Sequence, residues 1–307
     1  MKVVSFYRFL DIRDPQALRD DLQALCDEQQ LLGTVLVATE GFNGTIAGSR
    51  SAVRKVFSWL RTRLQIKEEL DARWTSADEA PFRRMKVRVK KEIVTLGRPD
   101  ILPHKNTGKY VAPEQWNELI GDPNVLLIDT RNHYEFEVGT FPGAIDPGND
   151  SFREFPEFAK KLAETSTDRP LAMFCTGGIR CEKATALMLE LRFDEVYHLQ
   201  GGILNYLEKI PVDENRWEGE CFVFDTRVAV DRDLAEGGYV QCHACRRPLS
   251  SADLESPDYR EGVSCPHCVN EADEDRVARL EERHRQVLLA AERGEVHIGP
   301  KSAGTAD

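Results

Sequence analysis

The sequence of 307 residues predicts a multidomain protein that combines an α+β domain with an α/β domain. Its length exceeds that of one average domain. Residues 1–97 contain runs of β-formers and amphipathic segments in the order βαββαβ, which is typical of an α+β unit. Residues 121–215 alternate short apolar runs with helical patterns, which is typical of a parallel α/β sheet.

The N-terminal segment predicts a ferredoxin-like domain, because two amphipathic helices alternate with strand-like runs. Asp14-Pro15 supplies an N-cap and a first-turn proline for the first helix. Asn43-Gly44 is a turn signal between strands. The expected strands are residues 3–10, 33–38, 66–74 and 85–94, and the helices run from Asp14 to about residue 30 and from Ser49 or Ser51 to about residue 63.

The rest of the chain is expected to form three further parts after a linker that contains Pro and Gly. Buried strands of the α/β domain are expected at residues 125–129, 171–174 and 196–199. A polar segment with four cysteines follows, and then a helix of alternating charge. The expected boundaries are a linker at 98–120, the α/β domain at 121–215, the cysteine-bearing segment at 216–270, and the charged helix and tail at 271–307.

Charge is distributed unevenly along the chain. The formal net charge is -11, but residues 1–100 hold 18 Lys and Arg against 14 Asp and Glu, so this third is positive. A phosphate-bearing partner is therefore expected to meet the N-terminal domain. The sequence has no uncharged apolar run of about 18 residues and no signal-peptide layout, so a cytoplasmic protein without a membrane span is expected.

Cys175 carries the strongest chemical signal in the sequence. It follows a buried strand and precedes the Gly-rich turn Thr176-Gly177-Gly178-Ile179, then Arg180 and a helix expected from Cys181. The N–H groups of such a turn and the positive end of the helix form an anion cradle, and Arg180 and Lys183 add positive charge. A thiol there ionises readily and acts as a nucleophile. The alternative is a small buried hydrophobic residue, which the Gly-Gly turn disfavours.

The loop from Cys175 to Arg180 has the form Cys-x-x-Gly-x-Arg and resembles the sulfur-transfer loop of the rhodanese family. The resemblance extends over residues 121–215, and it implies that Asp129 and Arg131 support the domain, as the Asp-x-Arg of the family does. Thr140 departs from the pattern, because the family has His there. Phosphatases of this fold carry the Arg one residue later, so the loop length indicates sulfur rather than phosphate chemistry.

Four further segments surround this domain, at residues 40–46, 85–94, 107–111 and 222–230. Together with it they are similar to the bacterial tRNA uridine hydroxylase family over almost the whole chain. This resemblance implies oxygen-dependent hydroxylation of the wobble uridine to 5-hydroxyuridine, with the anticodon region of tRNA as substrate, molecular oxygen as co-substrate and Cys175 as an essential persulfide. The sequence shows no flavin, haem or nucleotide-binding signature.

Lys86, Arg88 and Lys90 fall on one face of an expected strand, with two valines on the other face. This cationic face is a candidate RNA-binding surface, because Lys and Arg contact phosphates. The alternative is a half-buried strand with a solvated face, but the positive charge of the N-terminal domain favours RNA contact. Asn43 is a further candidate for RNA contact, or else a plain hairpin residue.

Two Cys-x-x-Cys pairs lie 19 residues apart near the C-terminus. Two such turns present four thiolates tetrahedrally, which predicts a structural metal site. Zinc is favoured over iron, and the alternative is four reduced thiols without a metal. The expected ligands are Cys242, Cys245, Cys265 and Cys268.

Two other functions stay open at this point. A plain sulfurtransferase would move sulfur from thiosulfate or a sulfur-donor protein to an acceptor, and would need only residues 121–215. A non-catalytic RNA- or protein-binding module would use the same fold as a scaffold, which the intact Cys175 loop disfavours. Cys181 is expected either to resolve a persulfide or disulfide, or to pack in the core.

Overall fold

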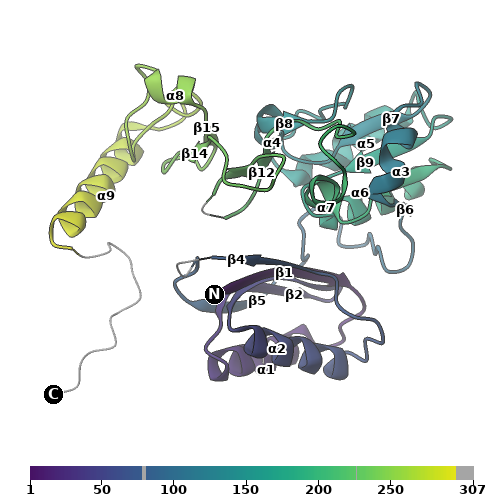
Figure 1. Ribbon diagram of the computed structural model, residues 1–307, viewed down its shortest axis with the longest axis horizontal. Coiled ribbons are helices and arrows are strands. Elements are labelled where there is room, and N and C mark those ends of the chain that lie inside the picture. The colour runs from purple at the N-terminus through teal and green to yellow at the C-terminus, as the bar shows by residue number, and fades with distance from the viewer. Residues whose placement is uncertain (78–80, 226, 295–307) are drawn as a thin grey trace. The chain divides into compact units, whose positions relative to one another are not determined.

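The computed structural model describes residues 1–77, 81–225 and 227–294, and it divides into two units (Figure 1). The first unit joins Met1–Asn132 to Gly143–Lys209. The second joins His133–Pro142 to the described chain from Ile210 onward. The first unit contains the two larger sheets, and the second contains short strand pairs and the C-terminal helices.

The N-terminal part of the first unit is a five-stranded sheet with two helices packed on one face (Figure 1). The strand order is β4-β1-β3-β2-β5. The first four strands and the two helices confirm the predicted ferredoxin-like βαββαβ order, and β5 adds a strand parallel to β2. The elements are β1 (Lys2–Phe9), α1 (Pro15–Glu28), β2 (Leu32–Ala38), β3 (Gly41–Gly48), α2 (Arg50–Arg63), β4 (Ala72–Ser76) and β5 (Met85–Val89).

Both helices of this domain begin where the sequence predicts. The Asp14 carboxylate accepts a hydrogen bond from the backbone N–H of Ala17 at 2.9 Å and caps α1. The Ser49 hydroxyl accepts one from the N–H of Ala52 at 3.1 Å and caps α2. Of the two serines considered, Ser49 is therefore the N-cap.

The turn predicted at Asn43-Gly44 is wrong. Both residues lie inside β3, and the chain turns before Gly41, which has a φ of 144°. Gly44 meets a packing requirement instead, because a Cβ there would lie 2.7 Å from the carbonyl oxygen of Thr34 on β2. A glycine needed for close strand approach and a glycine needed for a turn look alike in the sequence.

The second sheet of the first unit is parallel throughout and has the strand order β6-β10-β9-β7. Edge strand β6 and helix α3 fall within residues 98–120, so the prediction of a linker there is wrong. A three-residue edge strand has no apolar run to reveal it. The elements are β6 (Lys109–Val111), α3 (Pro113–Ile120), β7 (Leu126–Asp129), a 3-10 turn (Phe152–Glu154), α5 (Phe155–Ala163), β9 (Leu171–Phe174), α6 (Ile179–Glu190), β10 (Val196–Leu199) and α7 (Gly202–Lys209).

Apolar packing joins the two sheets of the first unit. Phe9, Ala38 and Ile93 from the N-terminal segment form a buried cluster, against which the half-buried Ile179 of α6 packs. A separate core fills the space between the helices and strands of the N-terminal domain, and another lies under α5 and α6. The N-terminal domain therefore contacts the helix that follows Cys175.

The second unit is built from two-residue strand pairs and three helices in its described part. The predicted charged helix forms as α9, where Asp273 accepts a hydrogen bond from the N–H of Arg276 at 2.7 Å and caps its start. Residues 295–307 of the predicted tail lie outside the described residues. The elements are α4 (His133–Val138), β8 (Gly139–Thr140), β11 (Glu218–Gly219), β12 (Cys221–Phe222), β13 (Ala229–Val230), β14 (Val240–Gln241), β15 (Pro248–Leu249), α8 (Ser251–Glu255) and α9 (Glu274–Glu292).

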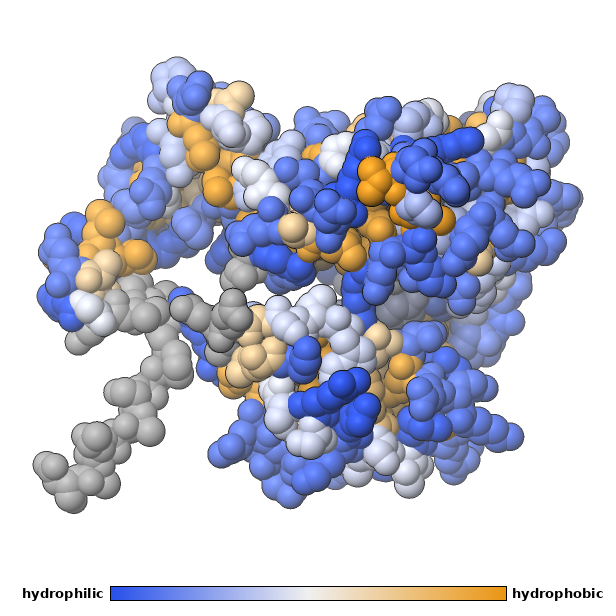
Figure 2. Space-filling view, viewed as in Figure 1, coloured by the Kyte–Doolittle hydropathy of each residue, from blue (hydrophilic) through white to orange (hydrophobic). Residues whose placement is uncertain are grey.

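The visible surface is mostly hydrophilic, and its apolar side chains lie in small groups (Figure 2). Among the described residues, no helix has both the length and the apolar composition that a membrane crossing requires.

Candidate active site around Cys175

Cys175 lies at the carboxyl end of β9, a strand whose four residues are all buried. The residue is 1% exposed. The helix expected from Cys181 begins two residues earlier, at Ile179, because Gly178 with a φ of 98° turns the chain directly into α6. Ile179 and Arg180 therefore belong to the first turn of the helix rather than to the loop, and the anion cradle is correspondingly short.

The Cys175 sulfur is held as an anion. The backbone N–H of Gly178 donates to its Sγ at 3.1 Å. Burial alone would raise the pKa of this thiol, but a hydrogen bond from the Cys181 thiol, the charge of Arg180 and the backbone N–H groups of Cys181 and Gly178 lower it to about 6. A thiolate is then the main form at neutral pH, which is the form that acts as a nucleophile.

The predicted cradle residues divide into two groups. Gly178 contacts the sulfur directly, while the carbonyl oxygen of Thr176 accepts from the N–H of Leu204 at 3.2 Å and ties the loop to α7. Gly177 is exposed, and a Cβ placed on it would meet nothing within 4 Å. The loop is therefore fixed on the Thr176 side and open above Gly177.

Cys181 lies beside the nucleophile, fully buried. Burial raises its pKa well above the ordinary value, and the hydrogen bond to Cys175 raises it further. Its Sγ also lies 3.4 Å from the hydroxyl oxygen of Thr130. Cys181 is thus a neutral thiol that donates to the Cys175 thiolate, and this polar contact adds to its packing role.

Asp129 and Arg131 form a buried pair at the end of β7. The Arg131 Nε and one terminal nitrogen donate to the two carboxylate oxygens at 2.9 and 2.6 Å. Between them, the N–H of Thr130 donates to the carbonyl oxygen of Phe174 at 3.0 Å, one residue before the nucleophile. This geometry supports the proposed structural role of the pair, because it holds the strand end that carries Cys175.

Lys183 binds carboxylates of the N-terminal segment, so the expectation that it adds charge at the sulfur site is wrong. Its ammonium group is fully buried and donates to Glu40 at 2.6 Å and to Glu92 at 2.7 Å. Burial raises the pKa of Glu40, and the bond from Lys183 opposes that rise. The charge of Lys183 is therefore neutralised by carboxylates from the N-terminal segment, which fastens that segment to α6.

Two residues that sequence reasoning missed complete the site. The hydroxyl of Tyr7, on β1, donates to the Glu182 carboxylate at 2.7 Å. The same hydroxyl lies so close to the loop that a Cβ on Gly178 would be 2.9 Å from it. Glu182 could have been noticed as an acid in the first turn after the loop, but no sequence signal connects Tyr7 with a residue 175 positions away.

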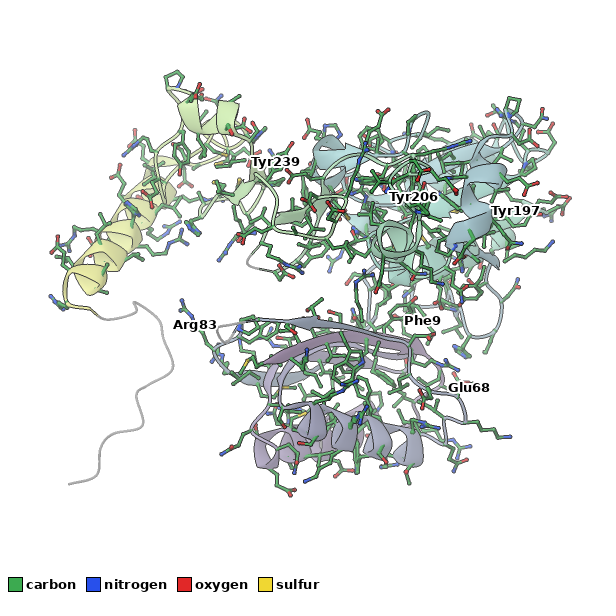
Figure 3. All side chains as sticks on the ribbon, in the orientation of Figure 1. Phe9, Glu68, Arg83, Tyr197, Tyr206 and Tyr239 are labelled. Atoms are coloured by element: carbon green, nitrogen blue, oxygen red, sulfur yellow. The ribbon has the colours of Figure 1, made fainter. Side chains whose placement is uncertain are left out.

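The candidate RNA-binding residues lie on and beside β5. Arg88 and Lys90 are exposed, Lys86 is half-buried, and Arg83 projects away from the N-terminal sheet (Figure 3). The amide nitrogen of Asn43 donates to the carbonyl oxygen of Ile93 at 3.1 Å, so it holds the end of this segment. These cations form a positive strip on and beside β5, and RNA contact stays a prediction.

The four C-terminal cysteines come together as predicted. Their sulfurs all lie within 4.8 Å of one another, with Cys245 and Cys265 3.7 Å apart and Cys265 and Cys268 3.6 Å apart. Four thiolates that bind Zn²⁺ tetrahedrally at about 2.3 Å are roughly 3.8 Å from each other. The cysteine cluster therefore fits a structural zinc ion, which Cys242, Cys245, Cys265 and Cys268 would hold.

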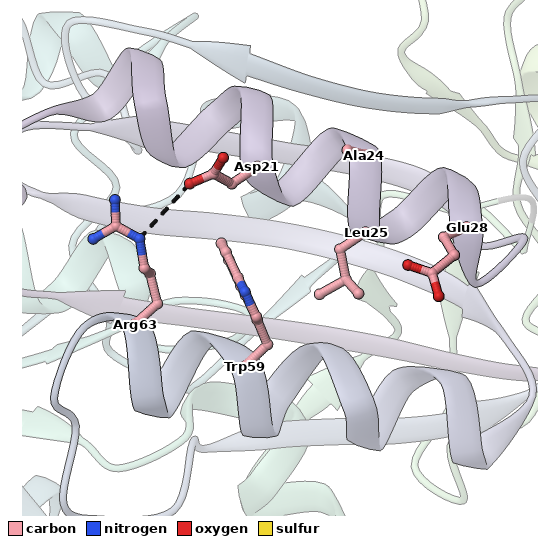
Figure 4. Close-up of a pocket in the computed structure, with 6 residues that line it drawn as sticks. All are labelled: Asp21, Ala24, Leu25, Glu28, Trp59 and Arg63. Atoms are coloured by element: carbon pink, nitrogen blue, oxygen red, sulfur yellow. Dashed lines mark ion pairs between the residues drawn. The ribbon is translucent and has the colours of Figure 1, made fainter.

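A separate groove of about 380 Å³ lies between α1 and α2 (Figure 4). Asp21 on one wall and Arg63 on the other approach to 3.7 Å and balance each other's charge. None of the residues that contact Cys175 lines this groove. The reactive centre is therefore the Cys175 loop and not this groove.

An activated cysteine on a Gly-rich turn above a parallel sheet is the arrangement of a rhodanese-like domain. The family model described as "Rhodanese-like domain" matches residues 112–209. A second model, "UPF0176 acylphosphatase like domain", matches residues 1–93. The chain therefore combines a UPF0176-type N-terminal domain with a rhodanese-like domain, and this combination supports sulfur-transfer or persulfide chemistry.

Several solved structures resemble about a third of the chain. The human single-domain sulfurtransferase TSTD1 is 25% identical, with 34% of this chain and 99% of that chain covered and a TM-score of 0.28. The Saccharomyces cerevisiae single-domain sulfurtransferase RDL2 is 22% identical, with 34% and 92% covered and a TM-score of 0.29. The BH2092 protein from Bacillus halodurans is 20% identical, with 38% and 80% covered and a TM-score of 0.30.

Proposed function

We propose that this protein is a tRNA-modifying enzyme that hydroxylates the wobble uridine to 5-hydroxyuridine with molecular oxygen, with Cys175 as a persulfide. The observation that carries the proposal is the direct contact between a positively charged domain and the reactive loop. Tyr7 of that domain reaches Gly178, and Glu40 and Glu92 bind Lys183 on α6. A sulfur-transfer domain that acts alone has no need of such an attachment.

The charge distribution supports RNA as the partner. The strip on and beside β5 places several cations in one domain, and nucleic-acid affinity depends largely on such contacts with phosphates. The anticodon arm would lie on this strip and present its base to Cys175. The strip consists of Arg83, Arg84, Lys86, Arg88, Lys90 and Lys91.

The decisive experiment is nucleoside analysis of tRNA from a deletion strain. Complementation with the wild-type protein is expected to restore 5-hydroxyuridine and the nucleosides made from it, and Cys175→Ala is expected to restore none. An unchanged nucleoside profile in the deletion strain would disprove the proposal. Rescue by Cys175→Ala would instead disprove the role of the thiol.

A second experiment tests the tRNA contact. Replacing Lys86, Arg88 and Lys90 together with Ala should weaken tRNA binding and reduce the slope of log affinity against log salt by about 2 to 3, roughly one unit per lost phosphate contact. The control replaces Lys55, Lys160 and Lys161, which lie on helices outside the strip. Equal losses in the two triple variants would show that total charge rather than the strip determines binding.

Plain sulfur transfer is the second candidate function. It is favoured by the match of residues 112–209 to the rhodanese-like model and by the lowered pKa of Cys175. A sulfur-donor protein or thiosulfate would load Cys175 with sulfur, and an acceptor would remove it. Activity of the protein in a thiosulfate–cyanide assay, together with unchanged tRNA nucleosides in the deletion strain, would favour this function.

A further inference from the structure

Glu182 places a carboxylate beside a loop built to hold an anion. It lies in the first turn of α6, where its N–H donates to the carbonyl oxygen of Gly178 at 3.1 Å. Its carboxylate accepts the Tyr7 hydroxyl at 2.7 Å, and that hydroxyl lies against Gly178. Gly178 in turn donates to the Cys175 sulfur. The sulfur, the glycine, the phenol and the carboxylate therefore form one continuous set of contacts.

The carboxylate and the thiolate act on each other. Burial raises the pKa of Glu182, hydrogen bonds from Tyr7 and Tyr110 and the charge of Arg8 oppose that rise, and the charge of Cys175 adds to it. Arg8 is also bound to Glu68 at 2.8 Å. Burial, and to a lesser extent the charge of Glu182, raises the pKa of Tyr7 well above the usual value. Tyr7 therefore stays protonated and keeps donating its hydrogen bond. The net effect raises the pKa of Glu182 above its ordinary value, while the bonds from Tyr7 and Tyr110 and the charge of Arg8 favour its carboxylate form.

We propose that Glu182, oriented by Tyr7, is a specificity residue that makes Cys175 accept sulfur from persulfides of thiols rather than from thiosulfate. The proposal rests on the sulfur chemistry of Cys175 and does not require RNA to be the substrate. It adds a reason for the contact between the two domains, because the phenol that orients the carboxylate comes from β1 of the N-terminal domain.

The two sulfur donors, a thiol persulfide and thiosulfate, differ in the charge that they carry when they approach Cys175 beside Glu182. With a thiol persulfide R–S–SH, the Cys175 thiolate attacks the outer sulfur, the S–S bond breaks, R–S⁻ leaves with the electron pair, and Cys175 becomes Cys–S–SH. With thiosulfate the same attack expels sulfite. The first reacting pair carries one negative charge and the second carries three. A neighbouring carboxylate therefore penalises thiosulfate more strongly.

Two alkylating agents measure this field at Cys175 directly. Iodoacetamide and iodoacetate react by the same displacement, but only iodoacetate carries a negative charge. In the full chain, both rates are followed at the Cys175 peptide by mass spectrometry. The iodoacetamide rate divided by the iodoacetate rate is expected to fall roughly tenfold in Glu182→Gln, because the anionic reagent no longer meets a carboxylate. The kcat/KM for thiosulfate in a cyanide assay should rise by a larger factor, because thiosulfate carries two negative charges and iodoacetate one. Tyr7→Phe should lower the rate ratio by about threefold, because the carboxylate loses its orienting bond.

Two control variants make the outcome decisive. Glu190→Gln removes the same charge from the same helix about 12 Å further along, at a half-exposed site, and should leave the ratio within about twofold. Glu182→Asp keeps the charge and should keep most of the discrimination. An unchanged ratio in Glu182→Gln, or an equal fall in Glu190→Gln, would overturn the proposal. If Glu182→Gln fails to fold, Tyr7→Phe and Glu182→Asp decide in its place. A deletion strain with unchanged tRNA nucleosides would contradict the proposed function alone, since the rate ratio does not involve RNA.

Discussion

Replacing Cys181 with Ala tests how the reactive thiolate is stabilised. Among the groups that lower the pKa of Cys175, the hydrogen bond from the Cys181 thiol is the largest, ahead of the charge of Arg180. The substitution removes that donor and leaves Arg180 and the backbone N–H groups in place. The pKa of Cys175 should therefore rise while the loop keeps its shape.

The magnitude follows from the nature of the lost contact. A hydrogen bond to a charged group contributes about 1.5–3 kcal/mol, and one pKa unit corresponds to about 1.4 kcal/mol. The pKa of Cys175 should rise from about 6 to roughly 7–8. At pH 7 the thiolate fraction would fall from about 90% to between about 10% and 50%. The cavity left by one sulfur atom should cost about 1 kcal/mol of stability.

The assay is the pH dependence of iodoacetamide alkylation at the Cys175 peptide. In the wild type the midpoint should lie near 6, and in Cys181→Ala it should lie at least one unit higher. Cys181→Ser is the matched control, because its hydroxyl still donates and its midpoint should stay near that of the wild type. The reasoning would be refuted if Ala and Ser shifted the midpoint equally, or if neither shifted it.

Three other perturbations test separate parts of the structure. Lys183→Met should lower the free energy of unfolding by about 3–5 kcal/mol in thermal unfolding, because two carboxylates stay buried without their cation. Changing both glutamates to Gln as well should recover most of the lost stability. A loss below about 1 kcal/mol in Lys183→Met would contradict this reasoning. Cys245→Ser should lose the bound zinc that elemental analysis is expected to find in the wild type, and unchanged zinc content would argue against the cysteine cluster as the site. Gly178→Ala should destabilise the chain by about 1–3 kcal/mol, because Gly178 has a φ of 98° and a Cβ there would meet the Tyr7 hydroxyl. Gly177→Ala should leave the stability unchanged, because the space around Gly177 is open. Equal losses in the two variants would contradict this geometry.

Local signals predicted much of the fold. The N-caps Asp14 and Ser49 act within three residues of themselves, and the buried strand before Cys175 is a continuous apolar run. Such features depend on neighbouring residues, and so they can be read from a single sequence. The four clustered cysteines were predictable for a related reason, since their spacing alone implies two turns that face each other.

The parts that could not be predicted depend on contacts between distant segments. The closeness of Lys183 to Arg180 in the sequence predicts that it adds positive charge near the sulfur, yet its partners lie 143 and 91 residues away. Gly44 gives the local signal of a turn residue, although it lies inside a strand that needs glycine for close approach. Tyr7 had no local signal at all. The position of a charged side chain in the first turn of a helix does not tell which neighbouring element will meet it.

The buried ion pairs of Lys183 bear on how this protein can be truncated. The two matched segments end at residue 93 and begin at residue 112, which invites a cut between them. Such a cut would leave Lys183 on the rhodanese fragment without its two ion-pair partners. On the N-terminal fragment, Glu40 and Glu92 would lose their cation, and the apolar cluster near them would be exposed to solvent. Both fragments should therefore be less soluble than the parent, and their co-expression should recover soluble material. An activity measured on the isolated rhodanese fragment would describe a cysteine without Tyr7 beside it.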